Sequence, residues 1–90
     1  MTHRLAVLIS GSGTNLQAIM AAIDSGRLDA QIAVVLSNRA DAGGLSRAQH
    51  AGIATEVLDH RQYDSREAFD QAMITTLDRY QPGTVVFFFF

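Results

Sequence analysis

The sequence predicts an α/β fold in which helices flank a parallel sheet, and three observations support this prediction. Short apolar runs alternate with segments whose apolar residues recur at helical spacing, which is the pattern of βαβ units. The connections between these segments are short, as they are in compact α/β domains. Residues 85–90 are apolar without alternation, as expected for a strand in a sheet that is covered on both faces.

A glycine turn joins the first strand to the first helix. The strand is the apolar run of residues 5–9, and the helix follows residues 10–15. Gly26 is placed to end this helix, and a second strand is expected at residues 32–36. The apolar face of the helix consists of Leu16, Ile19, Met20 and Ile23.

A shorter helix and a brief strand come next. We expect the helix at residues 44–51, with Leu45 and Ala48 facing the core and Gly52 at its end. The strand is expected at residues 55–58.

A third helix and a fourth strand complete the pattern. Asp64 and Glu67 have capping-box spacing, which predicts that Asp64 caps the helix. The Pro-Gly pair at residues 82–83 ends the helix, and residues 84–90 are read as the strand. The apolar stripe of the helix consists of Phe69, Met73, Leu77 and Tyr80.

These elements predict a Rossmann-like sheet with the strand order 3-2-1-4, in which the last strand lies at an edge. The phenylalanines at residues 87–90 are expected in the core of this sheet or, alternatively, form an anomalous terminus. A bare apolar edge strand tends to pair with another chain, so we expect self-association through it. Either a partner covers this edge or the chain is the front part of a longer protein, and we favour the second interpretation.

Size and composition restrict the class of protein. Ninety residues make one small domain or part of a larger one. The net charge of -2 argues against a general nucleic-acid binder. The sequence has no cysteine, which excludes disulfides and thiolate metal sites, and no His, Asp and Glu spacing typical of a metal site. It also has no apolar run of membrane-spanning length and no secretory leader, so we expect a cytoplasmic protein without membrane contact.

The turn Ser-Gly-Ser-Gly-Thr-Asn at residues 10–15 is the strongest functional signal. Gly11 and Gly13 allow a tight turn and close approach of a ligand, and the first N–H groups of the following helix have no acceptor within the helix. This combination predicts a site for a small phosphorylated metabolite. Ser12 and Thr14 could also act as helix caps, a role compatible with phosphate contact.

A dinucleotide-binding module is the alternative. Its Gly-x-Gly-x-x-Gly fingerprint is met at Gly11 and Gly13, but Leu16 stands at the third position. Arg39, after the second strand, could accept the 2′-phosphate of NADP. A Walker-type loop is excluded because no Gly-Lys-Ser/Thr follows the turn.

Longer strings of sequence are more specific. LISGSGTNLQAI at residues 8–19, SNRADA at residues 37–42, AGIAT at residues 51–55 and DSREAFD at residues 64–70 occur in this order. Together they resemble the N-terminal portion of the folate-dependent glycinamide ribonucleotide transformylases over residues 5–86. The resemblance implies a formyltransferase-type fold.

The resemblance also implies a reaction and a set of binding residues. The reaction is formyl transfer from 10-formyltetrahydrofolate to the amino group of glycinamide ribonucleotide in de novo purine synthesis, without a metal. Gly13, Thr14 and Asn15 would hold the 5′-phosphate of the substrate, and Arg66 would lie on the folate side of the cleft. A related formyltetrahydrofolate hydrolase, which gives the formyl group to water, is a further alternative.

The chain departs from the family at its fourth strand. Family members end this strand in a small, glycine-containing segment, where this chain has Phe89 at the glycine position. The catalytic Asn, His and Asp of the family lie beyond that strand. Residues 1–90 are therefore expected to be the N-terminal phosphate-binding portion, truncated after the fourth strand, with no catalytic residue of its own and little or no turnover alone.

Several polar residues have a structural interpretation beside the functional one. Arg66 could simply pair with Asp70 or Glu67 on the surface of the third helix. Asn38 follows the second strand at the edge where ligands bind, but a turn-forming role is at least as plausible. The three histidines, His3, His50 and His60, are interpreted as solvated surface residues.

Overall fold

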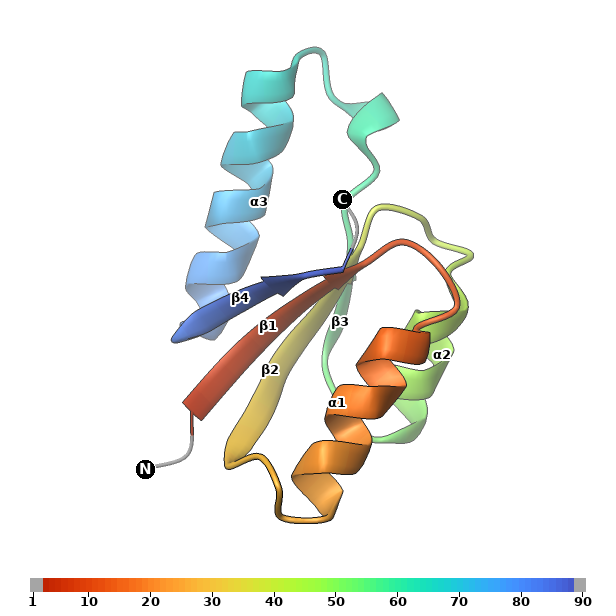
Figure 1. The fold of residues 1–90 in the computed structure, drawn as a ribbon. Coiled ribbons are helices and arrows are strands. Elements are labelled where there is room, and N and C mark those ends of the chain that lie inside the picture. Colours follow the sequence, from red (N-terminus) through yellow and green to blue (C-terminus); the bar gives the residue numbers. More distant parts are fainter. Residues whose placement is uncertain (1–2, 89–90) are drawn as a thin grey trace.

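The computed structural model describes residues 3–88 and contains four strands, three α-helices and one 3-10 turn in that part of the chain. The chain alternates between strands and helices, as the apolar pattern predicts (Figure 1). In order, the elements are β1 (His3–Ile9), α1 (Thr14–Asp24), β2 (Ala30–Ser37), α2 (Gly43–His50), β3 (Thr55–Val57), η1 (His60–Gln62), α3 (Arg66–Tyr80) and β4 (Thr84–Phe87).

The sheet is parallel and has the order β3-β2-β1-β4, which confirms the predicted topology. The central strand β1 has a neighbour on each side, so Leu5 faces Ile32 of β2 and Thr84 of β4. Because all four strands run the same way, their carboxyl ends lie along one edge, where ligands bind in open α/β sheets.

Helices cover both faces of the sheet, with α1 and α2 on one face and α3 on the other (Figure 1). Successive residues of β1 alternate between these two layers. Leu5, Val7 and Ile9 pack toward α1 and α2, whereas Ala6 and Leu8 pack toward α3. Burial on both sides explains why the strand sequences read as continuous apolar runs.

The predicted apolar faces of the helices are confirmed. Leu16 of α1 is fully buried, and Ile19, Met20 and Ile23 pack against the same core. In α3, Phe69 is buried and the rest of the predicted stripe packs around it: Met73, Leu77 and Tyr80.

The predicted cap of the third helix is wrong by one residue. Ser65, not Asp64, is the N-cap of α3, and its hydroxyl oxygen accepts a hydrogen bond from the N–H of Ala68 at 3.1 Å. The extended backbone of Ser65 places its short hydroxyl against the third helical N–H, which is the usual capping geometry. Glu67 is consequently in the first turn of the helix and not at the third helical position that a capping box requires.

The expectation that the phenylalanines after Val86 belong to the sheet core is only partly met. Phe87 is 60% exposed, whereas Phe88 is partly buried and packs against the core beneath α1. The difference arises because β4 is an edge strand, so the side chain of Phe87 lacks a neighbouring strand on its outer side. The remaining two phenylalanines lie outside the described residues.

Asp59 gives the fold a measurable pH dependence. Its carboxylate accepts hydrogen bonds from the side chain and the backbone N–H of Arg61, and these contacts lower the pKa of Asp59 from 3.8 to about 2. A pKa lowered by folding adds stability that is complete above pH 4 and is lost as the pH falls toward 2. We expect Asp59→Asn to flatten the loss of stability in this pH range, measured by urea unfolding at a series of pH values. Asp78→Asn, which removes an exposed carboxylate that has no ion pair in the described structure, should leave the profile unchanged.

Candidate anion site at the glycine turn

The glycine turn lies at the carboxyl edge of the sheet, between the end of β1 and the start of α1. Gly13 is the N-cap of α1 and has φ 81° and ψ 26°, a left-handed conformation that a residue with a side chain rarely adopts. The side chains of Ser12 and Thr14 do not cap the helix, contrary to one of their predicted roles. Their hydroxyl oxygens are 3.1 Å apart and hydrogen-bond to each other instead.

Five consecutive backbone N–H groups in this turn have no hydrogen-bond acceptor within residues 3–88. They belong to residues 12–16, and the first intrahelical bond of α1 is donated by the N–H of Gln17 to the carbonyl of Gly13 at 2.8 Å. Unpaired N–H groups at the start of a helix carry partial positive charge and favour a bound anion. No acidic residue lies in the first turn of α1 to compete for them.

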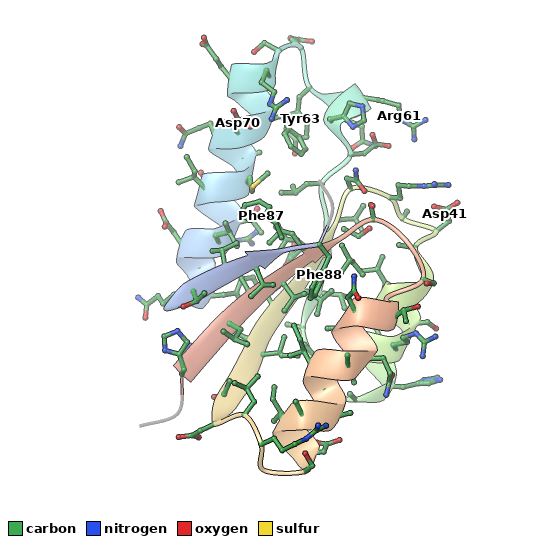
Figure 2. The ribbon with its side chains drawn as sticks, in the orientation of Figure 1. Asp41, Arg61, Tyr63, Asp70, Phe87 and Phe88 are labelled. Atoms are coloured by element: carbon green, nitrogen blue, oxygen red, sulfur yellow. The ribbon has the colours of Figure 1, made fainter. Side chains whose placement is uncertain are left out.

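A cavity of about 250 Å³ adjoins these N–H groups. Its walls come from the end of β1, the turn and the first residues of α1, together with Phe88. Figure 2 shows Phe88 beside the N-terminal end of α1. Since one water molecule occupies ~30 Å³ in the liquid, the cavity has room for a phosphate group, and Phe88 forms one apolar wall.

The three residues predicted to bind phosphate lie together at this cavity. Gly13, Thr14 and Asn15 all line it, and the side chains of Thr14 and Asn15 are exposed. The side chain of Asn15 forms no hydrogen bond within the described residues, so its amide is free to contact a ligand. Whether they hold a phosphate stays a prediction.

The turn is in direct backbone contact with α2. A Cβ atom placed on Gly13 would lie 2.5 Å from the Cα of Gly44, a distance that real Cβ atoms do not reach. The N–H of Gly44 also donates to the carbonyl of Gly11 at 3.1 Å. Glycine is therefore required at position 13 both by its positive φ and by the approach of a second backbone.

Arg66 lies at a different cavity, of about 830 Å³, on the α3 side of the sheet. Its guanidinium Nε is 3.5 Å from Oδ1 of Asp70, and its side chain is 84% exposed. The surface ion pair between Arg66 and Asp70, expected if Arg66 has only a structural role, is thus present. The side chain of Arg66 also lines a cavity. Phe87, the last residue of β4, lines the cavity at Arg66, and Phe88 lines the one at the glycine turn. The N–H of Phe88 still donates to the carbonyl of Leu8 on β1 at 3.0 Å, so the alternation between the two sides of the sheet continues to this residue.

A turn-forming role does not account for the side chain of Asn38. It follows β2 and lines the cavity, and its side-chain oxygen is buried without a hydrogen-bond partner among the described residues. The turn after β2 is held by Ser37 instead, whose hydroxyl donates to the carbonyl of Arg39 at 2.8 Å. The same cavity is lined by four apolar or aromatic side chains, those of Tyr63, Phe69, Met73 and Phe87.

The residue on which the NADP alternative depends is already paired. The guanidinium of Arg39 donates two hydrogen bonds of 3.1 Å to the two carboxylate oxygens of Asp41. This pairing lowers the pKa of Asp41. The fingerprint position occupied by Leu16 is fully buried, so the helix is anchored there by a large side chain instead of a glycine.

The three histidines are exposed, as predicted. The ring of His3 hydrogen-bonds to the hydroxyl of Thr84, and the ring of His60 packs edge-on against Phe69 beside the larger cavity. Within residues 3–88, no three His, Cys, Asp or Glu side chains converge in a way that could hold a metal ion. None of the helices in that range combines the length and apolar character needed to cross a membrane.

Comparison with known proteins yields one consistent family. A sequence model described as formyl transferase matches residues 3–90. Phosphoribosylglycinamide formyltransferase from Escherichia coli is 49% identical over 82 residues, which are 91% of this chain and 39% of that protein. The trifunctional purine biosynthetic protein adenosine-3 of Gallus gallus is 46% identical over 77 residues, which are 86% of this chain and 8% of that protein.

Solved structures agree with this relationship. Phosphoribosylglycinamide formyltransferase from Coxiella burnetii superimposes with a TM-score of 0.93 at 47% identity, covering 97% of this chain and 41% of that one. Glycinamide ribonucleotide transformylase 1 from Symbiobacterium toebii gives a TM-score of 0.90 at 48% identity, covering 96% and 41%. The chain thus spans about two fifths of the length of the relatives from Escherichia coli, Coxiella burnetii and Symbiobacterium toebii. Its fold and its sequence together place the chain in the formyl transferase family.

Proposed function

We propose that this chain is the substrate-phosphate-binding portion of a phosphoribosylglycinamide formyltransferase that acts in purine synthesis in the cytoplasm. The observation that carries the proposal is the run of acceptor-free N–H groups at residues 12–16 beside a cavity of phosphate size. The similarity to proteins that bear this name supports the choice of substrate. In this proposal Gly13, Thr14 and Asn15 hold the 5′-phosphate of glycinamide ribonucleotide.

The physical basis of phosphate binding is charge-assisted hydrogen bonding to backbone N–H groups. Each such bond contributes roughly 1.5–3 kcal/mol when the acceptor is ionised. The positive end of the α1 dipole adds to this attraction. The site therefore needs no cluster of basic side chains, which agrees with the net charge of -2.

The formyl donor in this proposal is 10-formyltetrahydrofolate, and Arg66 contacts it at the larger cavity. Aromatic and thioether side chains in the walls suit a flat heteroaromatic ligand. For Arg66 to bind an anionic group of the donor, its exposed ion pair with Asp70 must open, which costs little because surface ion pairs contribute ~0–1 kcal/mol.

The reaction joins the two sites. The amino nitrogen of glycinamide ribonucleotide forms a bond to the formyl carbon and loses a proton. The bond from that carbon to nitrogen 10 of the folate breaks, and nitrogen 10 takes up a proton. We assign residues 13–15 and Arg66 to binding and none of the described residues to catalysis. We accordingly propose that the chain by itself binds substrate without turnover.

Ligand-dependent thermal stability tests the binding assignment. Glycinamide ribonucleotide should raise the melting temperature of the chain, because a ligand at 100 times its dissociation constant stabilises by ~2.7 kcal/mol. The corresponding riboside, which lacks the phosphate, is the matched control and should have little effect. Stronger stabilisation by NADP than by glycinamide ribonucleotide would favour the dinucleotide alternative and contradict the proposal.

An activity assay tests the proposal that the chain by itself does not catalyse formyl transfer. The chain is incubated with 10-formyltetrahydrofolate and glycinamide ribonucleotide, and both formylated product and free formate are measured. We expect neither to form. Formylated product would show that the chain is catalytically complete, and formate alone would favour the hydrolase alternative.

The exposed edge strand supports a further part of the proposal, namely self-association through β4. Phe87, on β4, is 60% exposed, and Leu28, which follows α1, is 39% exposed. We expect the wild-type chain to sediment as dimers or larger species. At the same concentration Phe87→Lys should be monomeric, because a charge on an edge strand opposes strand pairing. Leu28→Lys is the matched control, since Leu28 is an exposed apolar residue between α1 and β2, and β1 separates β2 from β4. A monomeric wild-type chain, or equal effects of the two substitutions, would contradict pairing through β4.

A further inference from the structure

The structure assigns a positioning role to Arg47, a residue of α2 that does not line the cavity at the glycine turn. We propose that its guanidinium orients the peptide group between Ser12 and Gly13 so that the Gly13 N–H faces the phosphate. This inference rests on the proposed function and specifies how the site is held in shape.

Two consecutive carbonyl groups of the turn are drawn toward α2. The Gly11 carbonyl accepts a hydrogen bond from the N–H of Gly44 at 3.1 Å. The Ser12 carbonyl accepts one from Nε of Arg47 at 2.9 Å. Both donors belong to the same short helix, so α2 fixes the two peptide groups together.

The orientation of the N–H groups follows from the geometry of the peptide bond. In a trans peptide the C=O and the N–H point in opposite directions, and no peptide bond among the described residues is cis. The N–H groups of Ser12 and Gly13 therefore point away from α2. The cavity of about 250 Å³ contains no lining residue from α2, so these two N–H groups face the side of the turn on which the cavity lies.

The guanidinium of Arg47 is itself held in place. Its Nη1 donates to the side-chain oxygen of Gln17, a residue of α1, at 3.3 Å. The side chain of Arg47 thus bridges the glycine turn and α1. Within residues 3–88 it forms no ion pair with a carboxylate. A charged donor on the Ser12 carbonyl also polarises that peptide group, which makes the Gly13 N–H a stronger donor toward an anion.

Two variants with an uncharged residue at position 47 separate positioning of the turn from direct attraction between the charge of Arg47 and the phosphate. In Arg47→Gln, the side-chain Nε2 stands at the same number of bonds from the backbone as Nε of arginine, so one N–H donor is kept. Arg47→Met has a similar length but carries a methyl group there. The two variants have the same net charge and differ in the hydrogen bond to Ser12.

The measurement is titration of the chain with ribose 5-phosphate, followed by amide nitrogen–proton NMR and calorimetry. We expect Arg47→Met to weaken binding about tenfold, the loss that corresponds to one charge-assisted hydrogen bond, and Arg47→Gln to stay within about threefold of the wild type. Without ligand, the Gly13 amide signal should shift in Arg47→Met and stay near its wild-type position in Arg47→Gln. Arg27→Ala, which removes an exposed guanidinium that bonds to Ser25, controls for net charge.

Equal losses in Arg47→Gln and Arg47→Met would overturn positioning in favour of direct attraction between Arg47 and the phosphate. Wild-type affinity in Arg47→Met would overturn any role of Arg47. If the wild-type chain does not bind ribose 5-phosphate at all, the proposed function fails. The ligand-free shift of the Gly13 amide then decides separately whether Arg47 orients the turn.

Discussion

Gly13→Val is expected to abolish the stabilisation of the chain by phosphate-bearing ligands and to lower its free energy of unfolding by about 2–5 kcal/mol. The positive φ of Gly13 costs a residue with a side chain ~1–2 kcal/mol. The new Cβ would also meet the Cα of Gly44 at 2.5 Å, and overpacking of this kind costs roughly 1–3 kcal/mol. Relief of either strain moves the Gly13 N–H away from the cavity, so binding is lost with the turn.

Gly26→Val is the matched control for this substitution. Gly26 follows α1, away from the glycine turn, and has nearly the same positive φ of 79°, but a Cβ placed on it meets no atom within 4 Å. Urea unfolding should show only the conformational cost of ~1–2 kcal/mol for Gly26→Val, and its thermal shift with ribose 5-phosphate should match that of the wild type. A thermal shift with phosphate that persists in a folded Gly13→Val chain would contradict the assignment of the site to this turn.

Leu16→Ala is expected to lower the free energy of unfolding by about 2–5 kcal/mol, the range for removing a fully buried leucine side chain. Leu16 has no exposed surface and anchors the first turn of α1 against β1. A domain of this size melts ~4–8 °C lower for each kcal/mol lost, so the effect is large in a thermal scan. Because the acceptor-free N–H groups belong to the same helical turn, we also expect weaker binding of ribose 5-phosphate.

The same exchange at an exposed leucine separates core packing from a general effect of Leu→Ala. Leu28, which follows α1, is 39% exposed, and its truncation should cost less than ~1 kcal/mol. If Leu16→Ala and Leu28→Ala destabilise equally, Leu16 does not anchor the helix as described.

The sequence predicts the layer architecture well because periodicity reports burial directly. The two apolar runs that end near Ser10 and Ser37 are strands, as predicted. Leu45 and Ala48 are buried, as their helical spacing indicates. Helix boundaries agree within two residues, since local patterns set them. The choice between Asp64 and Ser65 as cap was not predictable from spacing, because either residue type can accept the hydrogen bond.

The contacts that shape the site could not be predicted in the same way. Gly44 and Arg47 touch the glycine turn only because α1 and α2 pack side by side on one face of the sheet. Nothing in the local pattern of residues 43–50 marks them, since a glycine at the start of a helix and an exposed arginine are common. The exposure of Phe87 is likewise a property of the sheet edge and not of its apolar sequence.

The pairing of β1 with β4 has a consequence for how the molecule assembles. β1, α1 and β2 form a unit that is nearly contiguous in sequence, whereas β4 reaches β1 only after the chain has passed through α2, β3 and α3. Closing a longer loop costs more chain entropy, and contacts between distant residues slow folding. Since Phe88 follows β4 and walls the cavity at the glycine turn, we expect the cavity to have its full shape only when β4 is paired with β1.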